Sequence, residues 1–348
     1  MRELIIGVDL HKLQASYAVL DRSQTVYAEE NIRNEDRDKI REFLLRWKQP
    51  ETTTTLIVEA TGGWYWFVDF VAPLVDRVKL ADTFWSAQCL KGRAAKNDRI
   101  DAQDLAKLEI RGQVEEGYQM PKELREVRDV LRTRMRLVQE RTAMKNRIHA
   151  VLTKNGIRFK GTDLYGPGGQ AWLARQMLPE AWRLQIDEQL RLIEEYDESI
   201  RRFESFARRS EKVRNHPHVK LLSTIPGVGT IWGMTIGMEI ADVGRFKTPE
   251  ELVCYAGLAP TLHQSMNTKH YYGLHLHRNV WLKGALGMVA LKARQDPQLK
   301  DEYERAKKKY KKVVCNVVVA RKLARIIFWM LTRKEKFRGS SPKAVLTA

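Results

Sequence analysis

The chain of 348 residues is 43% hydrophobic and 30% charged, a balance with which a soluble protein can bury a sizeable core. No uncharged apolar run approaches the roughly 18 residues of a membrane span, and the first residues lack the pattern of a signal peptide. The three cysteines, Cys89, Cys254 and Cys315, form no CxxC pair. This argues against a disulfide scaffold or a cysteine zinc site, and we expect a cytoplasmic protein.

The net charge of +18 is concentrated in two stretches of the chain. Residues 121–160 contribute 12 basic and 4 acidic side chains, and residues 301–348 contribute 14 basic and 4 acidic ones, so the remainder is neutral. Such clustering favours a polyanionic partner, and nucleic acid is the one we predict. Solvated helix faces remain the alternative. An anionic membrane surface is disfavoured because no amphipathic anchor with an aromatic face stands out.

Residues 1–115 show the pattern of an α/β domain. Short apolar runs predict five strands, and apolar side chains at helical spacing predict helices between them. The predicted strands are 4–10, 15–20, 24–29, 56–59 and 77–80, and the predicted helices are 35–47, 64–75 and 100–110. This order of elements indicates an α/β domain with a mixed sheet.

Residues 116–215 are predicted to form a helical arm. Apolar side chains recur every three or four residues on both sides of a glycine-rich segment, 156–169. The pattern predicts two long helices joined by a loop or a small insert and paired as a coiled coil. A plain helical bundle remains the alternative.

Residues 216–335 are predicted to be a mostly helical domain, and the tail 336–348 to be disordered. The segment 225–229, IPGVG, resembles a helix-hairpin-helix turn, in which the amides of Gly227 and Gly229 would hold a phosphate. A tight turn between two helices explains the same residues equally well, so both interpretations stay open.

Four acidic residues occupy positions from which they could converge. Asp9 lies at the end of the first predicted strand and Glu59 closes the fourth, while Asp98 and Asp101 share a face at the start of a helix. Four close carboxylates repel one another and raise one another's pKa unless divalent cations such as Mg²⁺ or Mn²⁺ bind them. Paired ions can stabilise the in-line displacement of a phosphodiester.

Each acid alone has an ordinary explanation, as a helix cap or an ion-pair partner. Asp104 is either a fifth acidic group or a surface residue. The strand order and the placement of the acids together predict a ribonuclease-H-like domain. The sequence GVD also opens actin-like ATP-binding folds, but His11 and Lys12 follow Asp9 here in place of a glycine-rich phosphate loop.

These segments resemble the DEDD insertion-sequence transposases, also described as bridge-RNA-guided recombinases. The matching motifs are GVDLHK (7–12), VEATGGWYW (58–66), AAKNDRIDAQDLAKL (94–108), IPGVG (225–229) and AGLAPTLHQS (256–265). The resemblance implies an N-terminal RuvC-like domain whose acids Asp9, Glu59, Asp98 and Asp101 hold Mg²⁺ or Mn²⁺, and a C-terminal transposase domain whose serine nucleophile is Ser265. It also implies a noncoding RNA that pairs with donor and target DNA, a homo-oligomer, and a place in the bacterial cytoplasm with the nucleoid.

The sequence departs from the family pattern after the serine. Met266 occupies the position where the family usually has glycine. Residues 278–283, RNVWLK, occupy the positions where the family usually has Gly-Asn-x-x-Leu-Arg. The implied chemistry is consistent, because a serine that attacks a DNA phosphate conserves the bond energy in a phosphoserine link. A structure-specific RuvC-like nuclease, in which a metal-bound water replaces Ser265, is the alternative. A non-catalytic nucleic-acid binder is the third interpretation.

Basic residues are expected to hold the nucleic acid by its backbone, so that RNA base pairing selects the sequence. They lie along the arm, near Ser265 and in a dense run of lysines: Arg132, Arg134, Arg136, Arg141, Lys145 and Arg147; Lys269, Arg278 and Lys283; Lys307, Lys308, Lys309, Lys311 and Lys312. Histidines also flank the serine: His263, His270, His275 and His277. They could hold phosphates, whereas a zinc site has no cysteine to support it.

Overall fold

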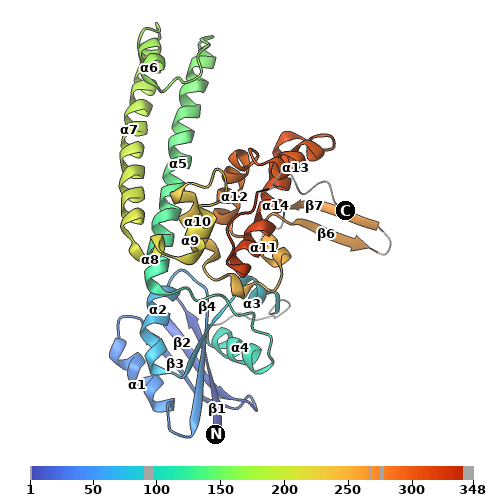
Figure 1. Ribbon diagram of the computed structural model, residues 1–348. Helices are drawn as coiled ribbons and strands as arrows, with labels where there is room; N and C mark the ends of the chain where they lie inside the picture. Colours follow the sequence, from blue (N-terminus) through green and yellow to red (C-terminus); the bar gives the residue numbers. More distant parts are fainter. Residues whose placement is uncertain (1, 90–97, 266–267, 275–277, 340–348) are drawn as a thin grey trace, which may run out of the picture. The chain divides into compact units, whose positions relative to one another are not determined.

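The computed structural model describes residues 2–89, 98–265, 268–274 and 278–339 (Figure 1). Internal contacts divide the chain into two compact units between Lys122 and Glu123. The arm and the C-terminal helices thus fall in one unit, and each unit is described by itself. The expected disorder of the last residues falls mostly on 340–348, which lie outside the described residues.

Unit 1 is built on a five-stranded sheet with the order β3-β2-β1-β4-β5. Its strands are β1 (Arg2–Leu10), β2 (Gln14–Asp21), β3 (Val26–Arg33), β4 (Thr52–Glu59) and β5 (Arg77–Ala81). The first three strands pair antiparallel, whereas β1, β4 and β5 run parallel. The predicted mixed sheet is therefore confirmed.

Helices cover both faces of this sheet because successive strand residues point to opposite sides. On one face, α1 (Arg37–Trp47) and α2 (Trp64–Val71) pack against alternate residues of β1 and β4. On the other face, α4 (Asp98–Ile110) packs through Ala102, Leu105 and Ala106 (Figure 1). The face that α4 covers carries the acidic strand residues.

Three local predictions for unit 1 need correction. The helix predicted to reach residue 75 ends at Val71 and continues as a short 3-10 helix, η1 (Ala72–Leu74), because Pro73 has no amide to donate. The strand predicted at 24–29 runs instead from Val26 to Arg33, after a turn in which Gln24 has a positive φ of 65°. The helix α3 (Thr83–Cys89) was not predicted.

The arm of unit 2 consists of two long antiparallel helices, α5 (Lys122–Lys154) and α7 (Glu180–Arg209), with the short α6 (Pro167–Ala174) between them (Figure 1). Buried residues recur every seven positions along α7, at Ile186, Ile193, Ile200 and Ala207. Two ion pairs repeat with the same period, Arg134 with Glu204 and Arg141 with Asp197. A strict seven-residue repeat is the signature of coiled-coil packing.

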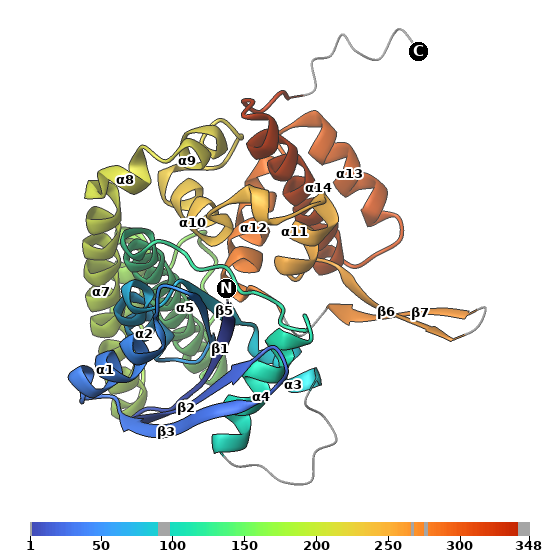
Figure 2. The same ribbon diagram turned by 90° about the horizontal axis from the view of Figure 1, so that it is seen from below.

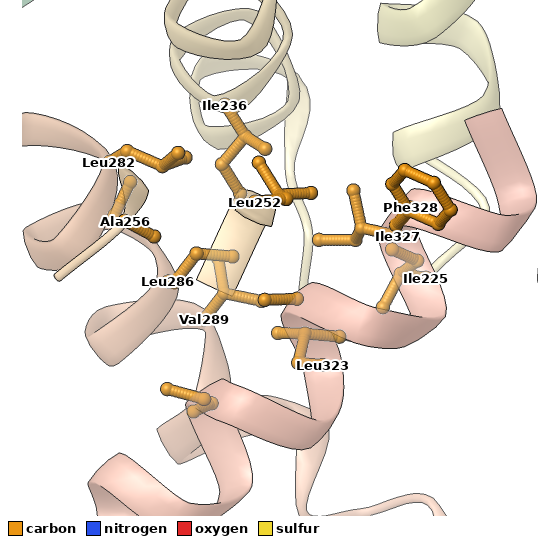
Figure 3. Close-up of a cluster of buried hydrophobic side chains, with 14 of the residues drawn as sticks. Ile225, Ile236, Leu252, Ala256, Leu282, Leu286, Val289, Leu323, Ile327 and Phe328 are labelled. Atoms are coloured by element: carbon orange, nitrogen blue, oxygen red, sulfur yellow. The ribbon is translucent and has the colours of Figure 1, made fainter. Parts of the chain in front are cut away.

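All but the first of the remaining helices of unit 2 contribute to a common apolar core. These remaining helices are α8 (Glu211–Arg214), α9 (Pro217–Leu222), α10 (Thr230–Ile240), the 3-10 helix η2 (Val243–Arg245), α11 (Pro249–Tyr255), α12 (Val280–Ala293), α13 (Pro297–Lys307) and α14 (Lys312–Arg333). Figure 3 shows this core, in which Ile236 of α10, Leu252 of α11, Leu286 of α12 and Leu323 of α14 converge. Within the described residues, no helix is long and apolar enough to cross a membrane.

A two-stranded hairpin extends from these helices, formed by β6 (Pro260–Ser265) and β7 (Thr268–Leu274) (Figure 2). It was missed by the prediction of mostly helical structure. The two residues between the strands, Met266 and Asn267, do not form the Asn-Gly or Asp-Gly pair that marks a tight hairpin in a sequence.

Candidate active site

Asp9 and Glu59 lie side by side on neighbouring parallel strands. Val8 of β1 is in register with Val58 of β4, so the next residue of each strand is a carboxylate at the same level of the sheet. Both acids belong to the face covered by α4, because Ile5 and Ile57, at even spacing from them, pack against that helix. The sequence predicted this pairing from the strand ends alone.

Gly7 brings the start of α4 close to these acids. A Cβ at Gly7 would lie 1.9 Å from the carbonyl oxygen of Ala102, so the helix backbone rests directly on β1. At the far end of α4, Glu109 is close enough to Arg22 for their charges to interact, and Arg22 bonds Glu3 at the beginning of β1. The helix therefore runs antiparallel to β1, and its first turn is directed toward the level of Asp9.

That first turn contains the other two predicted acids. Asp98 begins α4 and Asp101 precedes Ala102, but the Asp98 side chain lies outside those described. Among the described side chains, no group of three or more histidines, cysteines and acids is placed to hold a metal ion. Asp104 is only 4% exposed, so its interpretation as a surface residue is wrong.

His11 is a neighbour of Asp9 that the sequence analysis left without a role. Its Nε2 lies 3.0 Å from Oδ2 of Asp9, and the imidazole is about half exposed. The turn that joins β1 to β2 places it there, with the His11 amide donating to the carbonyl of Gln14. The spacing Asp-x-His at a strand end is the only signal for this contact in the sequence.

Ser265 is the last residue of β6, where it pairs with Thr268 of β7. Three other candidates also lie on the hairpin backbone: His263 is in register with His270, and Lys269 with Gln264. The side chains of these residues lie outside those described, as do Met266, His275 and His277 altogether. The serine belongs to unit 2 and the acids to unit 1.

A buried glutamate ties the segment after the hairpin to the arm. Glu239 of α10 is 2% exposed, and it accepts hydrogen bonds from Nε and Nη2 of Arg132 at 2.6 and 2.7 Å. Asn279 donates through Nδ2 to Glu239 at 2.7 Å and to the Tyr255 hydroxyl at 2.9 Å, and its backbone amide donates to the carbonyl of Tyr255. Glu239 carries no motif signal and was missed in the sequence.

The six predicted basic residues of the arm each contact another group of unit 2. Arg132 bonds Glu239, while Arg134 and Arg141 form ion pairs with α7. The other three contact aromatic or sulfur groups: Arg136 over Trp281 at 5.3 Å, Lys145 over Tyr165 at 4.5 Å, and Arg147 with Sδ of Met144 at 3.4 Å. Arg136 and Arg147 are nevertheless exposed, and a role of these six residues in nucleic-acid binding stays a prediction.

The lysine run is more accessible. Lys307 forms an ion pair with Glu304 at 3.7 Å, and the four lysines at 308, 309, 311 and 312 are exposed. Near the end of the hairpin segment, burial lowers the pKa of the Lys283 amine, and the charge of Arg278 lowers it further. Two mutually repelling cations there are an environment that an anion would stabilise.

The structure of the IPGVG segment (225–229) favours a tight turn between two helices over a phosphate-binding helix-hairpin-helix turn. Gly227 has a φ of +83°, and a Cβ there would lie 2.6 Å from Cβ of Lys292 on α12. A tight turn packed on a neighbouring helix thus explains Gly227. Gly229 is the N-cap of α10 with open space around it, and phosphate binding there stays a prediction.

Comparisons with known proteins find transposases similar to both units. A model of DEDD-type transposases matches residues 6–156, and a model described as "Transposase IS116/IS110/IS902 family" matches residues 219–304. The "Transposase for insertion sequence element IS1111A" of Coxiella burnetii is 27% identical over 300 residues, covering 81% of this chain and 79% of the relative. A family 20 transposase of Pseudomonas aeruginosa is 23% identical over 343 residues, covering 96% and 98%.

The chain is therefore a transposase, an enzyme that cleaves and recombines DNA. It resembles the IS110-family transposases in both of its units, which confirms the resemblance predicted from the motifs.

Proposed function

We propose that this transposase exchanges DNA strands with a RuvC-like metal site in unit 1 and a serine nucleophile in unit 2. The observation that carries the proposal is the pairing of Asp9 with Glu59 on adjacent parallel strands, beneath the first turn of α4. Together with Asp98 and Asp101, these residues would form an all-oxygen donor set of the kind that Mg²⁺ and Mn²⁺ prefer.

In this proposal the four carboxylates of unit 1 would hold the divalent ion, which supplies polarisation of the scissile phosphate. Asp9 and Glu59 are fixed by the sheet register, so their spacing is set before DNA binds. His11 would help to position the Asp9 carboxylate, because its Nε2 lies 3.0 Å from Oδ2. Such fixed geometry is what electrostatic catalysis requires.

Ser265 would attack the DNA phosphate through Oγ, forming a serine–phosphate ester as the bond to one DNA strand breaks. The ester keeps the phosphate at the energy of a phosphodiester, so a second strand can replace the serine without ATP. The position of Ser265 at the end of a hairpin strand supports this role, because the strand projects from the helical core of unit 2 (Figure 2).

Sequence selection would come from a noncoding RNA that pairs with donor and target DNA, in a homo-oligomer. The support for the RNA is the resemblance to the bridge-RNA-guided recombinases together with a strongly basic chain. The exposed lysines 308, 309, 311 and 312 would contact phosphates of either nucleic acid.

The proposal is tested by expressing the protein with its native flanking DNA, sequencing any RNA that copurifies, and assaying strand exchange. Asp9→Asn should abolish metal-dependent cleavage and exchange. Ser265→Ala should abolish exchange while RNA binding stays at the wild-type level. Asp38→Asn and Ser205→Ala, both at exposed positions, are the matched controls and should retain activity.

Three outcomes would contradict parts of this scheme. Undiminished turnover by the Asp9 variant would refute the metal site. Cleavage of branched DNA that survives Ser265→Ala and needs no RNA would show the structure-specific nuclease instead. Heterogeneous RNA that dissociates at moderate salt would show that the positive charge acts without a guide.

A further inference from the structure

A pocket of about 500 Å³ opens at the ends of the two strands that carry Asp9 and Glu59, which do not themselves line it. Its walls are Leu10, the last residue of β1, with His11 and Lys12 of the following turn, and Thr61 to Gly63 in the segment that follows β4. Trp66 of α2 completes it. Its volume is in the range of pockets that hold a small organic group.

Trp66 provides an aromatic wall that is held in place. The guanidinium of Arg37 stacks 3.5 Å from the ring centroid, and Phe67 meets the ring edge-on at 5.4 Å. Arg37 does not line the pocket, so it supports the ring from another side. An aromatic face fixed in this way is suited to stacking on a planar ligand without losing side-chain freedom.

The other walls offer cations and polar groups. Lys12 and His11 place positive or hydrogen-bonding groups at the rim, and His11 also contacts Asp9. Oγ1 of Thr61 is buried without a hydrogen-bond partner among the described residues. Gly62 and Gly63 bring bare backbone to the pocket, and a Cβ on Gly62 would meet nothing within 4 Å.

We propose that this pocket takes one unpaired base of the DNA strand whose phosphate lies at the carboxylates. The base would stack on Trp66, and Lys12 would hold the adjoining phosphate. A paired base hides its face between its neighbours, so only an unstacked base can use the tryptophan. The inference rests on the proposed function, because it places the reacting strand at Asp9 and Glu59.

The test uses the full-length chain with Asp9→Asn, which holds DNA without cutting it. The probe is a short single-stranded DNA that carries 2-aminopurine at one position, whose fluorescence falls when the base stacks on tryptophan. Quenching is expected at one or two adjacent positions of the strand and not with the same base in a duplex. A second change, Trp66→Leu, should remove the quenching and weaken binding about tenfold.

Three further variants separate stacking from damage to the fold. Trp66→Phe should retain most of the affinity, because phenylalanine also stacks. Gly62→Leu fills open space and should block the base while Trp66 is intact. Trp329→Leu, at an exposed tryptophan of unit 2, should leave both quenching and affinity unchanged.

Equal quenching with and without Trp66, or equal quenching by duplex DNA, would overturn the proposal. Displacement of the strand by deoxyadenosine monophosphate at equal concentration would also overturn it, since the pocket would then be a mononucleotide site. Because the readout is binding and not turnover, failure here leaves the metal and serine assignments to their own assay.

Discussion

Gly7 is the residue on which the placement of the acids depends most directly. A methyl group at this position would lie 1.9 Å from the backbone oxygen of Ala102, and a backbone atom in a helix cannot move aside alone. Gly7→Ala should therefore lower the free energy of unfolding of unit 1 by about 1–3 kcal/mol or more and push the first turn of α4 away from Asp9. Urea unfolding monitored by circular dichroism measures the change.

Gly62→Ala is the matched control for that experiment, because its Cβ meets no atom within 4 Å. It should change the free energy of unfolding by less than about 0.5 kcal/mol. If the two alanine variants prove equally stable, the close packing of α4 on β1 is wrong.

The positions of Asp9 and Glu59 at strand ends could be predicted, because the end of a strand is visible where a run of apolar residues stops. His11 and Glu239 could not. Each has its role through a contact across a turn or between distant helices, and such contacts leave no periodic signal. Asp104 is similar: its burial depends on how α4 meets the sheet.

Among the elements, the attachment of α5 to α10 and α12 depends on the buried Glu239. Arg132→Met would leave this carboxylate without its bidentate partner, at a cost of about 3–5 kcal/mol in the free energy of unfolding of unit 2. Thermal and chemical unfolding would measure it. Adding Glu239→Leu to Arg132→Met should recover much of the loss, since both charges are then absent.

An exposed pair gives the comparison for this element-scale prediction. Arg191 on α7 bonds Glu188, with side chains more than half exposed. Arg191→Met should cost less than about 1 kcal/mol, because water screens such pairs. A similar loss for Arg132→Met and Arg191→Met would contradict the structural role of Glu239.

The order of the elements could be predicted where the spacing of apolar residues and the length of the segment indicated the same kind of element. The five strands stand out as short apolar runs, and the long helices of the arm stand out because their apolar spacing repeats over many residues. The hairpin β6–β7 escaped because its loop residues carry no turn signal, and α3 escaped because seven residues are too few for a clear helical period.

Across the whole molecule, the charge of +18 predicts binding to DNA that weakens steeply with salt. Each phosphate contact contributes about 0.9 to the slope of log affinity against log salt concentration. Changing the lysines at 308, 309, 311 and 312 to glutamine should lower that slope by up to about 3–4, if all four contact phosphates. Fluorescence anisotropy with duplex DNA between about 50 and 200 mM salt measures it.

Glutamine at Arg134, Arg141 and Arg191 is the control, because these side chains already pair with carboxylates. The slope should change less than with the lysine variant. An unchanged slope in the lysine variant would exclude that run from the interface. The sequence could count these charges, but only the structure pairs Arg134 with Glu204 and Arg141 with Asp197, because these partners lie 70 and 56 residues apart.

Because the arm repeats every seven residues, its length can change in steps of one heptad. Removing one heptad from α5 and the facing heptad from α7 would bring the next ion pair and the next buried isoleucine into the vacated places. Each such step alters the reach by about 10 Å and leaves the junction with the helical core as it was. The length of the arm is thus set in whole heptads. The distance that the arm spans can therefore differ between relatives while both candidate sites stay intact.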